Sequence, residues 1–468
     1  MKHILIALAA LWILVQITSL IGLLNNPAGV TPLTHLTEPP AVRLTDPYRN
    51  AYFFLLGLAS SAALDPGKVG YEIWVEARET SDGRRFDYDR PERLDLQVSL
   101  PLGQAFPIWD AEDPINAFRD KGSPVKTWTS PHGLLLERYD HCLEMSFEDR
   151  GFGQRATPRF AETMLAHRLY IADGFSRSTA AGLDRLTKEL AFWRMVLREA
   201  TTPDMTVAAQ FVVQDDAKLI SRIVSRPVID KALLATALQL MVPLTSSEYS
   251  LRWPIRHQLA VAGREVQSRS APPKDSPISS NPQRDWLIAT THLPDNAFTK
   301  IEHPRPPSFL GRSLGSREMD EMYAGYYEAI TKASGTGEGS LPTLRQISGN
   351  VHRGFLEGLV NPAPVEPDWN IFRHQLMETD ARLRLASLQI QLRRPSGTTA
   401  VPTRLAEVGS QYFDPFTGLP MLWSQTQQKI YSVGKDRLDD GADASFDIAA
   451  PALIGLSSKN STGKDAQL

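Results

Sequence analysis

The sequence has very little cysteine, since Cys142 is the only one among 468 residues. An internal disulfide is therefore impossible, and a zinc site built from several thiolates is excluded as well. In an oxidising compartment a lone thiol can still pair with a second chain. Cys142 stands beside Leu143 in an apolar stretch, so we expect a buried and unreactive side chain.

An excess of positive charge is also missing. The chain carries 50 lysine and arginine residues against 53 aspartate and glutamate residues, which gives a formal net charge of -3. A nucleic-acid-binding protein needs a basic surface, so nucleic acid is not an expected partner. The sequence contains neither a His-Glu-x-x-His pattern nor a Walker loop. The zinc proteases and nucleotide-binding proteins that depend on those motifs are therefore excluded.

One long apolar run is present near the amino end. Residues 4–24 read ILIALAALWILVQITSLIGLL and carry no charged side chain. As a helix with a rise of about 1.5 Å per residue, this run measures about 30 Å, the thickness of the hydrocarbon core of a bilayer. The run therefore predicts a transmembrane signal anchor over residues 1–24. A cleaved signal peptide is the alternative, although its apolar core is usually shorter.

The charges on either side of this run indicate its orientation. Lys2 precedes the run, whereas the first positive charge after it is Arg43. By the positive-inside rule, the amino end lies in the cytoplasm and the bulk of the chain lies outside it, in the periplasm of a Gram-negative cell. We therefore expect a single-pass protein of the inner membrane, with envelope proteins as its partners.

Composition and apolar period divide the remaining chain, which is too long for a single core. Proline-rich stretches favour extended tethers and linkers, whereas apolar residues at helical spacing favour packed helices. The predicted segments are a Pro-rich tether at 25–46, a mixed α/β segment at 47–150, a helical domain at 151–263, a Pro/Ser-rich linker at 264–312, a helix with a connecting segment at 313–367, a C-terminal module at 368–450 and a disordered tail at 451–468.

The predicted fold class is mainly α, with an N-terminal transmembrane helix, a helical bundle-like body with a few strands, and a small C-terminal α+β module. Apolar residues recur at steps of three and four across residues 183–197, which places them on one face of a helix and favours antiparallel packing. A buried helix is expected within residues 48–64. Short strands are predicted at residues 70–77 and 94–100.

The carboxy-terminal part contains the most distinctive pattern. Residues 368–392 form the best amphipathic helix of the chain, with Phe372, Leu376, Leu383, Ala386 and Ile390 on one side. Residues 412–420 read YFDPFTGLP, which predicts a turn. Short strands are expected on either side of the hairpin sequence QTQQ, at 421–424 and 429–433, before a stretch rich in Asp and Gly that closes on Asp447 and Ile448.

This order of elements resembles the soluble head of the major pseudopilins of type II secretion systems, over residues 368–448. Those heads also have a long helix, an Asp-Pro turn followed by Gly and Pro, a strand that ends in an aromatic residue, Ser and Gly, and an Asp-rich loop. The resemblance implies a pseudopilin-like module whose loop binds calcium. The positions that match this loop are Ser432, Asp436, Asp439, Asp440, Asp443 and Asp447.

The residue chemistry of the loop permits calcium, because that ion takes about six to eight oxygen ligands and the glycines let the loop bend. The spacing is not that of an EF-hand, and Lys435 and Arg437 could instead neutralise the acids in a solvated turn. The amino end lacks the cleavage pattern of prepilins, so the resemblance does not extend to polymerisation into a pseudopilus.

The densest group of titratable side chains surrounds Cys142. Its members are His132, Glu137, Asp140, His141 and Glu144. Such residues can bind a metal or act as an acid and a base, although a helix of this composition normally carries them on its solvent face. We therefore expect a non-enzymatic docking or scaffold protein of the envelope, accessory to a secretion or pilus-like machine. The alternative is a membrane-anchored envelope hydrolase that acts on peptide or glycan.

Overall fold

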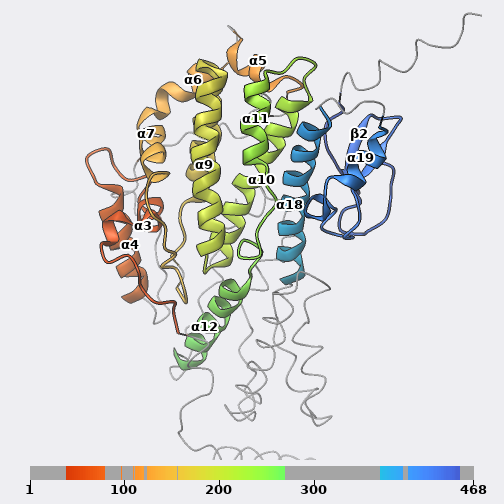
Figure 1. The fold of residues 1–468 in the computed structure, drawn as a ribbon. Helices are drawn as coiled ribbons and strands as arrows, with labels where there is room; N and C mark the ends of the chain where they lie inside the picture. Colours follow the sequence, from red (N-terminus) through yellow and green to blue (C-terminus); the bar gives the residue numbers. More distant parts are fainter. Residues whose placement is uncertain are drawn as a thin grey trace, which may run out of the picture.

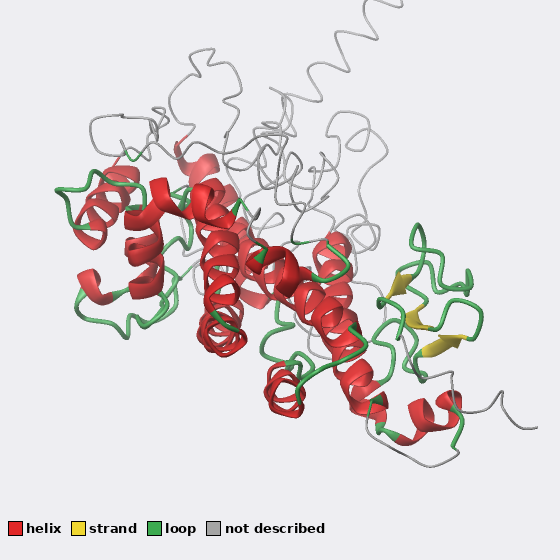
Figure 2. Cartoon of the chain, turned by 90° about the horizontal axis from the view of Figure 1, so that it is seen from above, coloured by secondary structure: helices red, strands yellow, loops and turns green. Residues whose placement is uncertain are grey.

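The computed structural model describes residues 38–79, 96, 109, 111–120, 124–154, 156–268, 369–393 and 399–453. Helices dominate these ranges, and most of them stand side by side in one body (Figure 1). A small antiparallel sheet lies at the edge of this body, as a view from above shows (Figure 2). The sheet belongs to the carboxy-terminal part of the chain.

The helices of the body follow one another with short connections. They are α3 (Ala51–Leu56), α4 (Pro66–Glu79), α5 (Pro114–Arg119), α6 (Val125–Thr129), α7 (Gly133–Cys142), α8 (Phe160–Arg177), α9 (Thr179–Glu199), α10 (Pro203–Ser225), α11 (Lys231–Leu240), α12 (Arg252–Ser268) and α18 (Trp369–Leu392). Short 3-10 turns are η1 (Pro47–Arg49), η2 (Ser130–His132) and η4 (Ser410–Tyr412), and α19 (Val401–Glu407) leads into the sheet.

The predicted fold class needs one correction, which concerns the membrane. No helix within the described ranges is both long enough and apolar enough to cross a bilayer. The prediction of a mainly α protein with an N-terminal transmembrane helix is therefore wrong in its spanning element. Residues 4–24, on which that prediction was based, lie outside the described residues. So do residues 269–368, which include most of the predicted linker and the segment that follows it.

Helices α8, α9 and α10 form the centre of the body. The hydroxyl of Ser178 caps α9, and that of Thr202 caps α10, so each connection is short enough to bring successive helices back against each other. The apolar stripe predicted across residues 183–197 is confirmed, because its leucines and Trp193 are buried in α9. Helix α10 is enclosed by α9, α18, α8, α5 and α12, and all its residues are buried except Gln214, Lys218 and Arg222.

The predicted strand at residues 70–77 is wrong, because these residues belong to helix α4. The side chains of Val69 and Ile73 are one helical turn apart and face the core together with Trp74. Helix α4 approaches α3 closely at Gly70, where a Cβ atom would lie 1.7 Å from the carbonyl oxygen of Phe53. The expected buried helix within 48–64 is confirmed as α3. Of the second predicted strand, 94–100, only residue 96 is described.

The sheet consists of β1 (Leu422–Ser424), β2 (Lys429–Ser432) and β3 (Ile448–Ala449) in the order β1-β2-β3. Strands β1 and β2 form the predicted hairpin, with Leu422 opposite Tyr431. Residues of the sheet pack on helix α18 and form a second apolar core around Ile430. This core is distinct from the large core of the body.

Helix α18 contributes to both cores. The predicted apolar face of this helix, from Phe372 to Ile390, lies in the core of the body. A second face, which carries Met377, Leu385 and Leu392, lies in the core of the sheet. The helix is thus apolar on two sides, and the sheet is attached to the body through it (Figure 2).

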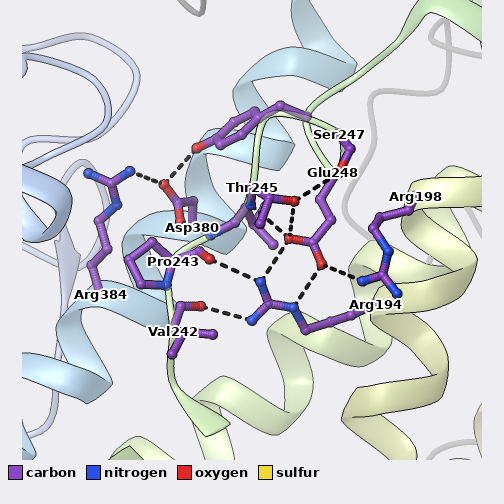
Figure 3. A network of polar contacts seen from close by, with 11 residues as sticks. Arg194, Arg198, Val242, Pro243, Thr245, Ser247, Glu248, Asp380 and Arg384 are labelled. Atoms are coloured by element: carbon purple, nitrogen blue, oxygen red, sulfur yellow. Dashed lines mark hydrogen bonds and ion pairs between the residues drawn. The ribbon is translucent and has the colours of Figure 1, made fainter. Parts of the chain in front are cut away.

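A polar junction reinforces this attachment (Figure 3). Glu248, in the connection between α11 and α12, is buried and receives two hydrogen bonds from the guanidinium of Arg194 on α9, each 2.8 Å long. The backbone nitrogen of Thr245 donates a further bond of 2.7 Å to Glu248. Burial opposes ionisation of Glu248, but these donors outweigh burial and lower its pKa.

The same connection also binds α18 (Figure 3). The carboxylate of Asp380 accepts a hydrogen bond of 2.7 Å from the backbone nitrogen of Leu244 and one of 2.8 Å from the hydroxyl of Tyr249. Arg384 pairs with Asp380 and also donates to the carbonyl oxygen of Phe413, which lies beside the sheet. A continuous series of polar contacts therefore runs from α9 to the sheet-containing part.

We predict that Glu248→Gln lowers the free energy of unfolding by about 3 kcal/mol, because a buried guanidinium loses its counter-charge. The matched control is Glu199→Gln, which removes the exposed ion pair with Arg43 and should cost less than about 1 kcal/mol. Urea unfolding at neutral pH measures both losses. Equal losses in the two variants would contradict the stabilising role of the junction.

The pH dependence of the same variant provides a second readout. Because the folded state lowers the pKa of Glu248 below its ordinary value of 4.5, ionised Glu248 contributes stability above that pH. This contribution is lost as the pH falls through the folded-state pKa. Unfolding of wild type and of Glu248→Gln between pH 7 and pH 3, at about equal salt, should therefore converge at the acid end.

Candidate functional site

Three ionisable side chains meet inside the helical body. They are His167 on α8, Glu189 on α9 and Asp216 on α10, and each is fully buried. One potential ligand atom from each lies within 4.8 Å of the other two. Within the described residues, this is the only group of three or more His, Cys, Asp or Glu side chains that converges so closely.

His167 lies between two carboxylates. Its Nδ1 atom is 3.0 Å from Oε2 of Glu189, although the contact lacks the angle of a hydrogen bond and both atoms are without a hydrogen-bond partner. Its Nε2 atom is 3.3 Å from Oδ2 of Asp215. Asp215 in turn accepts a 2.9 Å bond from Nε of Arg168. The ring therefore has one nitrogen fixed by Asp215 and the other directed at Glu189.

Glu189 is oriented by two aromatic side chains. The hydroxyl of Tyr139 on α7 donates a hydrogen bond of 2.5 Å to Oε1 of Glu189. The same hydroxyl accepts a bond of 2.8 Å from the indole nitrogen of Trp193. Since one carboxylate oxygen is engaged in this way, the other oxygen of Glu189 is left to face His167.

Asp216 differs from its neighbours because neither of its carboxylate oxygens has a hydrogen-bond partner among the described residues. A buried carboxylate in this situation is costly, since desolvation is not compensated by donors. The side chain is nevertheless completely buried. The site therefore contains two oxygens that are available to a ligand or a proton.

The electrostatics of the group follow from burial and mutual contact. Burial alone would lower the pKa of His167, but Glu189 and Asp215 outweigh burial and raise it to about 10. Burial would raise the pKa of Asp215, yet Arg168 and His167 lower it to about 2. Burial, and then the charge of Glu189, raise the pKa of Asp216 well above its usual range. In the absence of an ion, the imidazole is thus cationic and Asp216 holds a proton.

Sequence reasoning missed this group. Each member stands alone on its own helix, and no local spacing connects the three. A signal was present, because Glu189 occupies a position of the apolar stripe, three residues after Leu186 and four before Trp193. An ionisable residue on the buried face of a helix needs a partner inside the protein, and it therefore marks a candidate site.

The titratable residues singled out around Cys142 do not converge on one another. Cys142 is buried, as expected, whereas Glu137, His141 and Glu144 on α7 are exposed. His132 is buried, and its Nδ1 lies 2.6 Å from the carbonyl oxygen of Trp128. Glu144 and Asp140 share the ammonium of Lys188, at 2.8 Å and 2.9 Å. These residues form surface ion pairs rather than a metal site.

The six loop residues matched to the pseudopilin calcium site surround the end of β2. Asp436, Asp439, Asp440 and Asp443 are exposed, whereas Ser432 and Asp447 are buried. Most accept hydrogen bonds from nearby backbone nitrogens, such as the 2.8 Å bond from Ala442 to Asp447. One oxygen of Asp447 has no partner. No three acidic ligand atoms of this described loop lie within 4.8 Å of one another, and calcium binding stays a prediction.

We predict that Tyr139→Phe destabilises the protein by about 3 kcal/mol, because a buried carboxylate and a buried indole nitrogen both lose a partner. Tyr170→Phe is the matched control. The hydroxyl of Tyr170 bonds to Asp140, which is half-buried and also paired with Lys188, so the control should cost about 1 kcal/mol. Denaturant unfolding distinguishes the two. A control as costly as Tyr139→Phe would show that the buried network has no special weight.

Comparison with known proteins gives no independent guide to this site. No protein-family model, no curated protein and no solved structure matches the chain. The resemblance of residues 368–448 to pseudopilin heads is therefore neither supported nor opposed by these comparisons. What the protein does has to be argued from its own residues.

Proposed function

We propose that this chain is a non-enzymatic docking protein of the cell envelope, which binds another protein through its C-terminal module. The module is here residues 399–453, with helix α18 as its support. One observation carries the proposal: Leu419, Leu438 and Phe446 of the module are 64%, 64% and 58% exposed. Large apolar side chains on a surface are typical of a site where a protein partner excludes water.

The three exposed side chains come from loops at the same end of the sheet. Leu419 belongs to the turn that begins at Asp414, whose carboxylate accepts a hydrogen bond of 3.1 Å from the backbone nitrogen of Val433 at the end of β2. Leu438 and Phe446 belong to the loop between β2 and β3. The backbone of the module holds these loops, so the apolar side chains are presented on a defined support.

The module is also rigidly joined to the body, which suits a docking role. Helix α18 belongs to both cores, and the junction of Glu248 and Asp380 connects it to α9 (Figure 3). A partner bound to the module would therefore be held at a fixed position relative to the helical body. The envelope location and the link to a secretion or pilus-like machine rest on the resemblance to pseudopilin heads.

A triple variant with Leu419→Ser, Leu438→Ser and Phe446→Ser tests the docking proposal. Because the three side chains are exposed, the variant should unfold at the same urea concentration as wild type. We expect proteins that copurify with the wild-type chain after mild cross-linking to be lost from the variant. Val228→Ser, which removes an apolar side chain 84% exposed on the body, is the control and should retain them. An unchanged set of copurifying proteins in the triple variant would reject docking through this surface.

A second candidate function, hydrolysis of an envelope peptide or glycan, is favoured by a different observation. Glu137 and Asp140 line a surface pocket of about 340 Å³ together with Tyr170, Arg177 and Arg185. Two carboxylates beside two guanidinium groups can bind a polar substrate and transfer a proton. In addition, residues 311–315 read GRSLG, which matches the Gly-x-Ser-x-Gly pattern of hydrolases and lies outside the described residues.

The two candidate functions predict opposite results in a substrate assay. A panel of peptidoglycan fragments, peptides and esters is incubated with wild type, with Glu137→Gln and with Ser313→Ala. The docking proposal predicts no turnover by any of them. Turnover by wild type that falls by about 100-fold or more in either variant would replace docking with catalysis at that residue. His141→Ala is the control, because His141 is not part of the pocket lining.

A further inference from the structure

The buried group in the helical body has the composition and geometry of a metal site. Neither oxygen of the fully buried Asp216 has a hydrogen-bond donor, and one of them lies within 4.8 Å of a nitrogen of His167 and an oxygen of Glu189. Buried charges in proteins are normally paired or coordinate a metal. We propose that His167, Glu189 and Asp216 bind a single divalent transition-metal ion that links α8, α9 and α10.

The histidine is oriented as a metal ligand would be. Metal-binding histidines usually donate their second ring N–H to a carboxylate, which fixes the ring and its tautomer. Nε2 of His167 lies 3.3 Å from Asp215, which Arg168 holds in place at 2.9 Å. Nδ1 of His167 has no hydrogen-bond partner and is the atom directed at Glu189. Nδ1 is therefore the atom that binds the ion.

The glutamate shows the same division between ligand and support. Oε1 of Glu189 accepts the hydrogen bond of Tyr139, and the indole of Trp193 holds that hydroxyl. Oε2 has no hydrogen-bond partner and faces Nδ1 of His167. Each of these two ligands thus has one free ligand atom and one atom fixed by a second residue, as is common in metal centres.

Charge and ligand type identify the class of ion. A neutral imidazole with two carboxylates carries two negative charges, which a divalent ion neutralises inside the protein, while Arg168 compensates Asp215. An imidazole nitrogen favours zinc, iron, manganese or a related ion over calcium and magnesium, which prefer oxygen ligands. Bond lengths of about 2.0 to 2.2 Å for such ions require only small shifts of the three side chains.

The proposal does not depend on the docking function. An ion that binds the folded state and not the unfolded chain stabilises the fold, because it links three helices that are separate in the unfolded state. The site is fully buried, so the ion is expected to enter as the body folds. A metal-dependent fold and an exposed docking surface are compatible in one chain.

The test measures metal in the full chain. Wild type is unfolded in guanidinium with a chelator, refolded with Mn²⁺, anaerobic Fe²⁺, Zn²⁺ or Ca²⁺, freed of unbound ion, and analysed by inductively coupled plasma mass spectrometry. We expect about one equivalent of a transition metal per chain, little calcium at this site, and a higher melting temperature with the transition metal than without it. X-ray absorption should show oxygen and nitrogen neighbours that include one imidazole.

Two substitutions of the same kind separate this site from the Asp-rich loop. Asp216→Asn removes a ligand charge without changing the size of the side chain and should reduce bound transition metal at least about tenfold. Asp447→Asn makes the identical change in the loop and should leave transition-metal binding unchanged. Circular dichroism establishes that both variants fold.

Three results would overturn the proposal. Wild type that refolds to full stability and retains none of the transition metals has a proton-sharing group at this site instead of an ion. Asp216→Asn that binds as much metal as wild type places the ion elsewhere. An X-ray absorption spectrum that contains sulfur or lacks imidazole excludes this ligand set, and it does so even if the Asp216 variant fails to fold.

Discussion

Helix α10 is surrounded by other helices on every side, and the rest of the body is arranged to satisfy it. A polar residue on a surface helix can turn to water, but a polar residue of α10 needs a partner on a neighbouring helix. Asp215 pairs with Arg168 on α8, and Ser221 donates a hydrogen bond of 2.6 Å to Gln389 on α18. Because such partners must stand at matching heights, they fix the register of the neighbouring helices as well as their proximity.

The molecule deals with buried carboxylates in two different ways. Glu248 and Asp380 are supplied with arginine, tyrosine or backbone donors and carry their charge inside the protein (Figure 3). Asp216 receives no such donor, although it is equally buried. The contrast matters because the surrounding helices provide donors readily elsewhere. The environment of Asp216 is thus that of a ligand, whereas the environment of Glu248 is that of a structural ion pair.

How much could be predicted from the sequence depended on whether the signal was local. The stripe of α9, one face of α18 and the hairpin of β1 and β2 repeat at fixed spacings, and all three predictions are confirmed. Residues 70–77 were mistaken for a strand because a short apolar run fits either period, and only packing against α3 decides for a helix. The transmembrane helix predicted for the fold is not found among the described helices. The group around His167 has no local signal, since its members meet only after three helices have packed.

Helix α18 has a mechanical consequence for any protein that binds the C-terminal module. A tug on the sheet cannot be absorbed by a flexible hinge at this helix, because its other face is embedded in the core of the body. The load passes instead along α18 and across the Asp380 and Glu248 contacts into α9. The helix therefore acts as a shared beam, and detaching the sheet by force would require tearing the bundle open.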